Sequence, residues 1–168
     1  MKKTRTVVRA AILIALALVL SYIERFIPLQ LIIPLPGIKL GLANAVTLVS
    51  LYLLGPKQTV PIVLIRCLLG SLFGSITGLL FSLTGGILAI LTMALCKKVK
   101  IFSVYGISIL GAAAHNVGQI MAAMVIMNSI YVSAYLPYLL VIGICTGMAI
   151  GAACAGVLRI LKPVNISE

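Results

Sequence analysis

The chain has 168 residues, of which 62% are hydrophobic and 9% are charged, and its formal net charge is +11. Soluble domains are about half apolar and about a quarter charged, so this chain has too few charged side chains to cover a soluble core. The composition therefore predicts a polytopic all-α membrane protein, with residues 1–168 forming a single integral membrane domain.

Basic residues account for the charge, since 13 Lys and Arg stand against Glu24 and Glu168 alone. They cluster at the ends of apolar runs, which is the positive-inside pattern of membrane topology and gives no support to a nucleic-acid partner. The cysteines have no CxxC spacing and no nearby histidine. We therefore predict neither a metal site nor a redox pair, and no cofactor.

The first apolar segment follows a basic N-terminus and predicts a helix over residues 7–23 whose N-terminal end is cytoplasmic. It lacks a small-residue cleavage motif, so we expect it to be retained. Ala11 and Ala15 lie one turn apart on one face, where close helix contact is favoured. Residues 26–36 carry three prolines and cannot form a continuous helix. We expect this apolar stretch to fold over the protein as an outer lid.

Five more helices follow, over residues 40–54, 60–73, 79–95, 104–127 and 139–161. Glycines four residues apart, at 70, 74 and 78 and again at 143, 147 and 151, predict faces on which a neighbouring backbone approaches closely. Gly85 and Gly86 mark either a kink or a close approach. Ten basic residues fall on the inner side, against Arg25 and Lys39 outside. This count predicts six spanning helices with both termini cytoplasmic.

Lys39 stands at the predicted outer mouth of the second helix, between Gly37 and Gly41, and Asn44 follows Gly41 by one turn. The free N–H groups at a helix start attract anions, and a lysine adds positive charge there. We therefore predict that Lys39, Gly41 and Asn44 bind a small molecule. The alternative is that Lys39 only extends to the lipid head groups.

Polar side chains inside two later helices are the other candidate ligand contacts. Arg66 lies within the third helix, where an arginine must face a partner or a water-filled cavity; it either anchors a carboxylate or phosphate or bonds backbone carbonyls and head groups. His115, Asn116 and Gln119 form a polar cluster in the fifth helix, and His115 and Gln119 share one face. The alternative role of this cluster is interhelical packing. One histidine with no nearby carboxylate cannot complete a metal site.

The scarcity of acidic residues bears on enzymatic activity. Glu24 either pairs with Arg25, Lys39 or a cationic substrate group, or is a solvated helix end. Prenyl transfer from a diphosphate needs several carboxylates to hold magnesium, which Glu24 and Glu168 cannot supply. We therefore expect no catalytic residue, and at most an accessory role in such a reaction.

Four motifs resemble a bacterial membrane family called heptaprenyl diphosphate synthase component I, or the Gx transporter family. They are GIKLGLAN (37–44), RCLLG (66–70), SLTGG (82–86) and HNVGQ (115–119), and the resemblance covers nearly the whole chain. It implies a fold similar to the substrate-binding S components of energy-coupling factor (ECF) transporters, with six helices and a lid-like outer loop. It also implies an alanine motif facing the coupling subunit, which Ala11 and Ala15 match. Family relatives are encoded beside proteins of flavin-based extracellular electron transfer.

Together with these observations, the resemblance implies a substrate-binding subunit of an ECF-type transporter in the bacterial plasma membrane. It would capture a small anionic or amphipathic molecule from the outer side, with membrane lipid around it and a coupling subunit and ATPases as partners. The alternatives are a membrane accessory subunit for isoprenoid or quinone (heptaprenyl diphosphate) biosynthesis, and a membrane component of flavin-based extracellular electron transfer.

Overall fold

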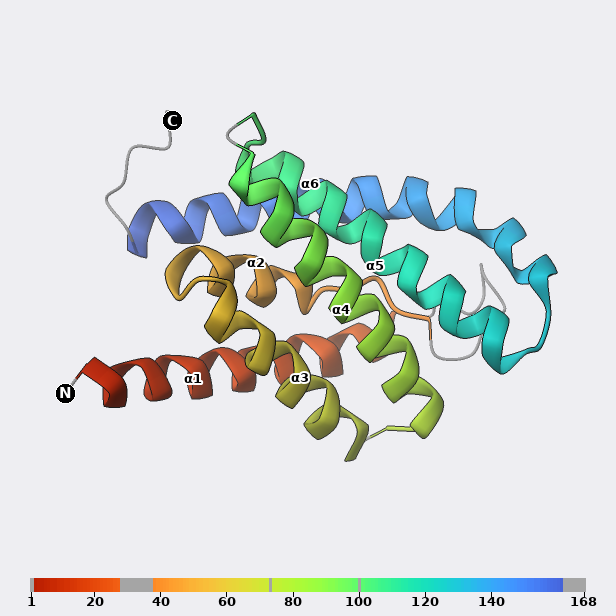
Figure 1. Cartoon of the computed structure of the whole chain (residues 1–168), viewed down its shortest axis with the longest axis horizontal. Coiled ribbons are helices and arrows are strands. Elements are labelled where there is room, and N and C mark those ends of the chain that lie inside the picture. Colours follow the sequence, from red (N-terminus) through yellow and green to blue (C-terminus); the bar gives the residue numbers. More distant parts are fainter. Residues whose placement is uncertain (1, 28–37, 73, 100, 162–168) are drawn as a thin grey trace.

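The computed structural model describes residues 2–27, 38–72, 74–99 and 101–161, which form six α-helices and two short 3-10 helices (Figure 1). Across those ranges the chain is all-helical, with no strand. The elements in chain order are α1 (Lys2–Ile23), η1 (Glu24–Phe26), α2 (Asn44–Leu53), α3 (Pro56–Leu72), α4 (Ile76–Lys98), α5 (Val104–Ile126), η3 (Ile130–Tyr135) and α6 (Leu136–Leu161). Each of the six predicted segments thus corresponds to an α-helix. Residues 28–36 of the predicted lid lie outside the described residues.

The predicted helix starts at the basic N-terminus and near residue 60 were too late. α1 begins at Lys2 and not at Val7, because Lys and Arg are good helix formers and continue the helix beyond its apolar segment. α3 begins at Pro56 and contains Pro61. Pro56 suits a first helical position, where its missing N–H would have no partner in any case. The predicted start at residue 60 is therefore four residues too late.

Four of the described segments are long and apolar enough to cross a membrane: Thr4–Phe26, Ile76–Lys98, Val104–Ile126 and Ile130–Leu161. The chain is therefore a membrane protein. α2 has only 10 residues, which gives a length of about 15 Å, about half of the hydrocarbon core of a bilayer. By length alone α2 cannot cross a membrane.

α2 is the central helix of the bundle. It contacts each of the other five α-helices, and Figure 1 shows it between α1 and α6. Its buried residues include Leu48 and Leu51, which have no exposed surface, and seven of its ten residues are buried in total. Because α2 is enclosed, its polar residues Asn44 and Thr47 are buried in the interior of the bundle. The segment that precedes α2 therefore also lies inside the bundle.

Successive helices run in alternating directions. The starts of α1, α3 and α5 and the ends of α2, α4 and α6 lie toward one end of the bundle, at the left of Figure 1. Basic side chains gather there, and we call it the basic end; those described are Arg5, Arg9, Lys57, Lys97, Lys98 and Arg159. The Lys97 ammonium donates to the carbonyl of Leu51 at 2.7 Å, which joins the end of α4 to the end of α2. The segregation of charge predicted from the sequence is thus present in the fold.

Glycines bring α5 close to both of its neighbours. A Cβ on Gly118 would lie 2.6 Å from the carbonyl oxygen of Thr84, and one on Gly147 would lie 2.8 Å from the Cα of Ile109. Backbone therefore packs on backbone between α4 and α5 and between α5 and α6, as the Gly143, Gly147 and Gly151 spacing predicted.

The earlier glycine series does not form such a face, and this prediction was wrong. α3 ends at Leu72 and α4 begins at Ile76, so Gly74 lies between two helices and Gly78 lies in the first turn of the next one. A Cβ on Gly70 would meet only the side chain of Leu18, at 3.7 Å. Equal spacing in sequence aligns residues on one face only while a single helix continues.

Candidate functional site

The segment from Ile38 to Ala43 is non-helical backbone that leads into the start of α2, away from the basic end and near the middle of the bundle (Figure 1). Non-helical backbone at membrane depth needs partners for its N–H and C=O groups. Gln119 on α5 supplies both for Lys39: its Oε1 accepts from the Lys39 N–H and its Nε2 donates to the Lys39 carbonyl, each at 2.7 Å. The Lys39 ammonium donates to Ser82 Oγ on α4 at 2.8 Å. Helices α4 and α5 therefore hold this segment in place.

Gly41 and Glu24 fix the next turn of the segment. Gly41 has φ +81°, the left-handed conformation that glycine adopts without strain, and its N–H donates to Glu24 Oε1. Glu24 is 4% exposed and interacts electrostatically with Lys39 and Arg66. The interpretation of Glu24 as a solvated helix end is therefore wrong, because η1 turns its carboxylate into the bundle.

Asn44, Arg66 and His115 meet beside this turn. Nη2 of Arg66 lies 3.5 Å from Asn44 Oδ1, at the long limit of a hydrogen bond. A Cβ on Gly41 would lie 2.8 Å from Asn44 Nδ2 and 3.3 Å from His115 Nε2, so glycine makes room for both side chains. The three residues come from α2, α3 and α5, and all are buried.

Two glycines of α4 form the wall behind this cluster. A Cβ on Gly85 would lie 2.6 Å from His115 Nδ1, and one on Gly86 would lie 3.4 Å from Nη2 of Arg66. Of the two alternatives predicted for Gly85 and Gly86, a kink and a close approach, the structure shows the close approach. Side chains of Arg66 and His115 occupy the space that two Cβ atoms would otherwise fill.

Four polar atoms of this cluster have no hydrogen-bond partner within the described parts of the chain: Asn44 Nδ2, Arg66 Nε, and both Nδ1 and Nε2 of His115. The first two are donors only, and a neutral imidazole donates from one of its nitrogens and accepts at the other. A buried polar group without a partner costs about 1–3 kcal/mol. The cluster is therefore a set of buried donors suited to a molecule that brings acceptors.

Of the seven predicted ligand contacts, the structure brings six together: Lys39, Gly41, Asn44, Arg66, His115 and Gln119. Asn116 points elsewhere, because its Nδ2 donates to the carbonyl of Leu139 at 2.6 Å and occupies the space beside Gly143 on α6. Neighbouring residues on a helix differ by about 100° in direction, so His115 and Asn116 face different partners. Ala11 and Ala15 are both exposed on α1, and their contact with a partner stays a prediction.

Sequence reasoning left Glu24 open between a partner of Lys39 or of a substrate and a solvated helix end, and it did not place Ser82 at the site. The sequence did contain an indication that Glu24 is functional, because it is one of only two acidic residues in the chain and follows an apolar helix. Ser82 belongs to the SLTGG motif, but a serine in an apolar helix bonds backbone as readily as side chains. In the structure its Oγ accepts from Lys39 and its carbonyl accepts from Cys67 Sγ at 3.3 Å.

No group of three or more His, Cys, Asp or Glu side chains able to hold a metal ion is found among the residues that the structure describes. The donor set itself is also unlike a metal site, because Asn44, Arg66 and Lys39 direct N–H groups inward, whereas a metal ion requires lone pairs. The arrangement suits recognition of acceptor oxygens by hydrogen bonds and positive charge.

The comparisons with known proteins identify a family. The family model for heptaprenyl diphosphate synthase component I matches residues 13–157, a range that holds every element from the middle of α1 to the last turns of α6. No curated protein and no solved structure matches the chain. The chain belongs to the heptaprenyl diphosphate synthase component I family.

Proposed function

We propose that the protein is a non-enzymatic, substrate-binding membrane subunit of an ECF-type transporter. Its ligand would be a small molecule with a carboxylate or phosphate group. The observation that carries this proposal is the set of buried polar atoms without partners on Asn44, Arg66 and His115. Acceptor oxygens of a ligand would complete these hydrogen bonds in an environment where charge-assisted bonds are strong.

The charges around the cluster favour an anion. Arg66 and Lys39 bring two positive charges near it, and Glu24 brings one negative charge. The Glu24 carboxylate is engaged by the Gly41 N–H, and Lys39 bonds Ser82. Among the described residues, Arg66 Nε has no hydrogen-bond partner and Nη2 makes a long bond to Asn44. Arg66 is therefore the group best able to receive an anionic ligand.

The basic end gives the proposal its orientation. Positive charge near the ends of spanning helices favours the cytoplasmic side, so the basic end would face the cytoplasm of a bacterial plasma membrane. Both chain termini would lie inside, and the cluster would receive its ligand from the opposite, outer side. The six predicted crossings would require the non-helical segment before α2 to span the membrane together with α2, which alone is too short.

A partner subunit would bind through α1. Only 11% of the apolar stretch of α1 is buried within the chain, against 33%, 50% and 33% in the other three long segments. Ala11 and Ala15 lie exposed on this helix, where small residues permit close contact with another helix. An ECF coupling subunit with its ATPases is the partner that this proposal requires, since binding alone moves no substrate.

Native mass spectrometry of the purified full chain, followed by identification of the retained small molecule, tests the proposal. We expect Arg66→Gln and Asn44→Ala each to lower ligand occupancy at least about tenfold. Ser108→Ala is the matched control, because Ser108 Oγ is also buried without a partner but lies beside Gly151 on α6. If wild type retains no ligand, or if all three variants behave alike, the proposal is wrong.

A second candidate function is favoured by the description of the family as heptaprenyl diphosphate synthase component I. In that case the protein would be an accessory subunit that presents a prenyl diphosphate to a separate synthase. Affinity purification from the native membrane distinguishes the two. Recovery of a coupling subunit and ATPases supports transport, and recovery of a soluble prenyl synthase supports the accessory role.

A further inference from the structure

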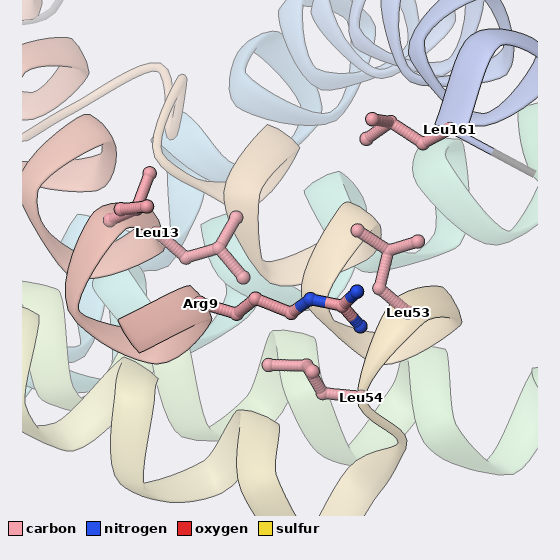
Figure 2. A pocket seen from close by; sticks show the side chains of 6 residues that line it. Arg9, Leu13, Leu53, Leu54 and Leu161 are labelled. Atoms are coloured by element: carbon pink, nitrogen blue, oxygen red, sulfur yellow. The ribbon is translucent and has the colours of Figure 1, made fainter. Parts of the chain in front are cut away.

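A cavity of about 340 Å³ lies at the basic end, far from the donor cluster. Figure 2 shows its lining side chains, which come from the first half of α1, the end of α2 and the end of α6. The residues that line it are Arg9, Ile12, Leu13, Leu53, Leu54 and Leu161. The cavity therefore combines five apolar side chains with one cation.

Arg9 extends across this cavity from α1 toward α2, and its guanidinium ends between Leu53 and Leu54 (Figure 2). Glu24, the acidic residue in the described part of the chain, directly follows the last residue of α1, at the opposite end of that helix from Arg9. No acidic side chain described at the basic end therefore neutralises Arg9. A guanidinium beside leucines needs an anion or water, and its planar N–H groups match phosphate oxygens.

A second hollow, of about 330 Å³, shares Arg9 with the cavity and is otherwise lined by Thr4, Arg5 and Val8. It has hydroxyl and guanidinium groups, whereas the cavity beside it is lined by leucines. The outer rim of the pair is apolar and exposed, with Val8 52%, Ile12 62% and Leu161 56% exposed. Along α1 the lining thus changes from polar to apolar, as a phospholipid changes from its polar head group to its acyl chains.

We propose that these two hollows form a binding site for one anionic phospholipid. Its phosphate binds Arg9 and Arg5, and an acyl chain lies among Leu13, Leu53, Leu54 and Leu161. The charge of the basic end attracts anionic lipids, and the arginine stem packs on hydrocarbon while its head reaches the phosphate level. The lipid would join α1 to α2 and α6, filling the gap beside the least buried of the long helices.

Native mass spectrometry of the full chain in detergent tests this site, with phosphatidylglycerol and phosphatidylcholine of identical acyl chains as probes. We expect phosphatidylglycerol to bind more tightly, and Arg9→Gln to weaken it about tenfold. Phosphatidylcholine has the same phosphate but no net charge, so the same variant should weaken it by a smaller factor. Arg159→Gln is the matched control, since Arg159 is an exposed arginine at the same end that lines neither hollow. It should change binding by less than about twofold.

A second variant tests the apolar part of the site. Leu161→Trp enlarges an exposed side chain at the rim and should weaken both lipids alike, without change in the thermal unfolding midpoint of the delipidated protein. Equal binding of the two lipids by wild type, or equal effects of Arg9→Gln and Arg159→Gln, would overturn the proposal. Displacement of phosphatidylglycerol by an equimolar prenyl diphosphate would also overturn it, and would assign the site to that ligand instead.

Discussion

The side chain of Gln119 bonds both backbone polar groups of Lys39, accepting from its N–H and donating to its carbonyl, each at 2.7 Å. An amide side chain thus satisfies both backbone polar groups of one residue that lies outside any helix. The pairing ties the segment before α2 to the middle of α5. It also brings the Lys39 ammonium within hydrogen-bond distance of Ser82 Oγ and packs Gly41 next to the His115 ring.

Replacing Gln119 tests this pairing. Gln119→Leu removes both hydrogen bonds and leaves a partly buried N–H and C=O without protein partners, at a cost of up to about 1–3 kcal/mol for each. We expect a lower thermal unfolding midpoint in detergent. Gln58→Leu is the control, because Gln58 is exposed near the start of α3 and should tolerate the same change. Equal midpoints for the two variants would show that the amide pairing contributes nothing to stability.

We expect Glu24 to stabilise the fold more through the oxygen that accepts from the Gly41 N–H than through its negative charge. In Glu24→Gln the amide oxygen still accepts from the Gly41 N–H, whereas Glu24→Ala leaves that N–H buried without a partner. We therefore expect Ala to lower the unfolding free energy by about 1–3 kcal/mol and Gln to restore part of that loss. The remaining deficit of Gln would reflect Lys39 and Arg66 without their nearby anion. Denaturant titration of the three proteins measures this order, and Gln at least as destabilising as Ala would contradict it.

Gly118 and Gly156 form a matched pair for the contact between α4 and α5. Gly118→Ala would place a Cβ 2.6 Å from the Thr84 carbonyl oxygen, so two backbones must separate, which costs about 1–3 kcal/mol or more. Gly156→Ala meets nothing within 4 Å and should gain up to about 1 kcal/mol of helix propensity. The two substitutions are chemically identical and should shift the unfolding midpoint in opposite directions. Shifts of the same sign would contradict the close approach of these helices.

A comparison of Gly41→Ala with Gly55→Ala distinguishes the effect of backbone strain from the effect of crowding at the candidate site. Both have positive φ, +81° and +82°, so alanine at either position costs about 1–2 kcal/mol of conformational strain. Only at Gly41 would the new Cβ also press on Asn44 and His115, at 2.8 and 3.0 Å; at Gly55 the nearest atom is 3.9 Å away. We expect similar losses from strain, with a further loss of stability and of retained ligand for Gly41→Ala alone. Unchanged ligand retention in Gly41→Ala would remove Gly41 from the site.

Much of the fold could be predicted from the sequence, because apolar runs, prolines and lysine clusters mark where helices begin and end. The direction in which each helix faces could not. His115 and Asn116 are equally polar neighbours, and only the packed bundle shows that one meets Asn44 and Arg66 while the other bonds Leu139. The burial of Glu24 was missed for the same reason, since it depends on η1 turning toward Gly41.

The link between Lys39 and Gln119 spans 80 residues of chain, and this separation has a consequence for biosynthesis. At about 5–20 residues per second, translation would produce the segment before α2 about 4–16 s ahead of its partner on α5. During that interval the backbone groups of Lys39 would have to be satisfied by water or by the insertion machinery. The candidate site would therefore be among the last parts of the protein to form. A chain interrupted before α5 would keep the contacts of the segment with Glu24 and Ser82 but would lack both backbone partners of Lys39.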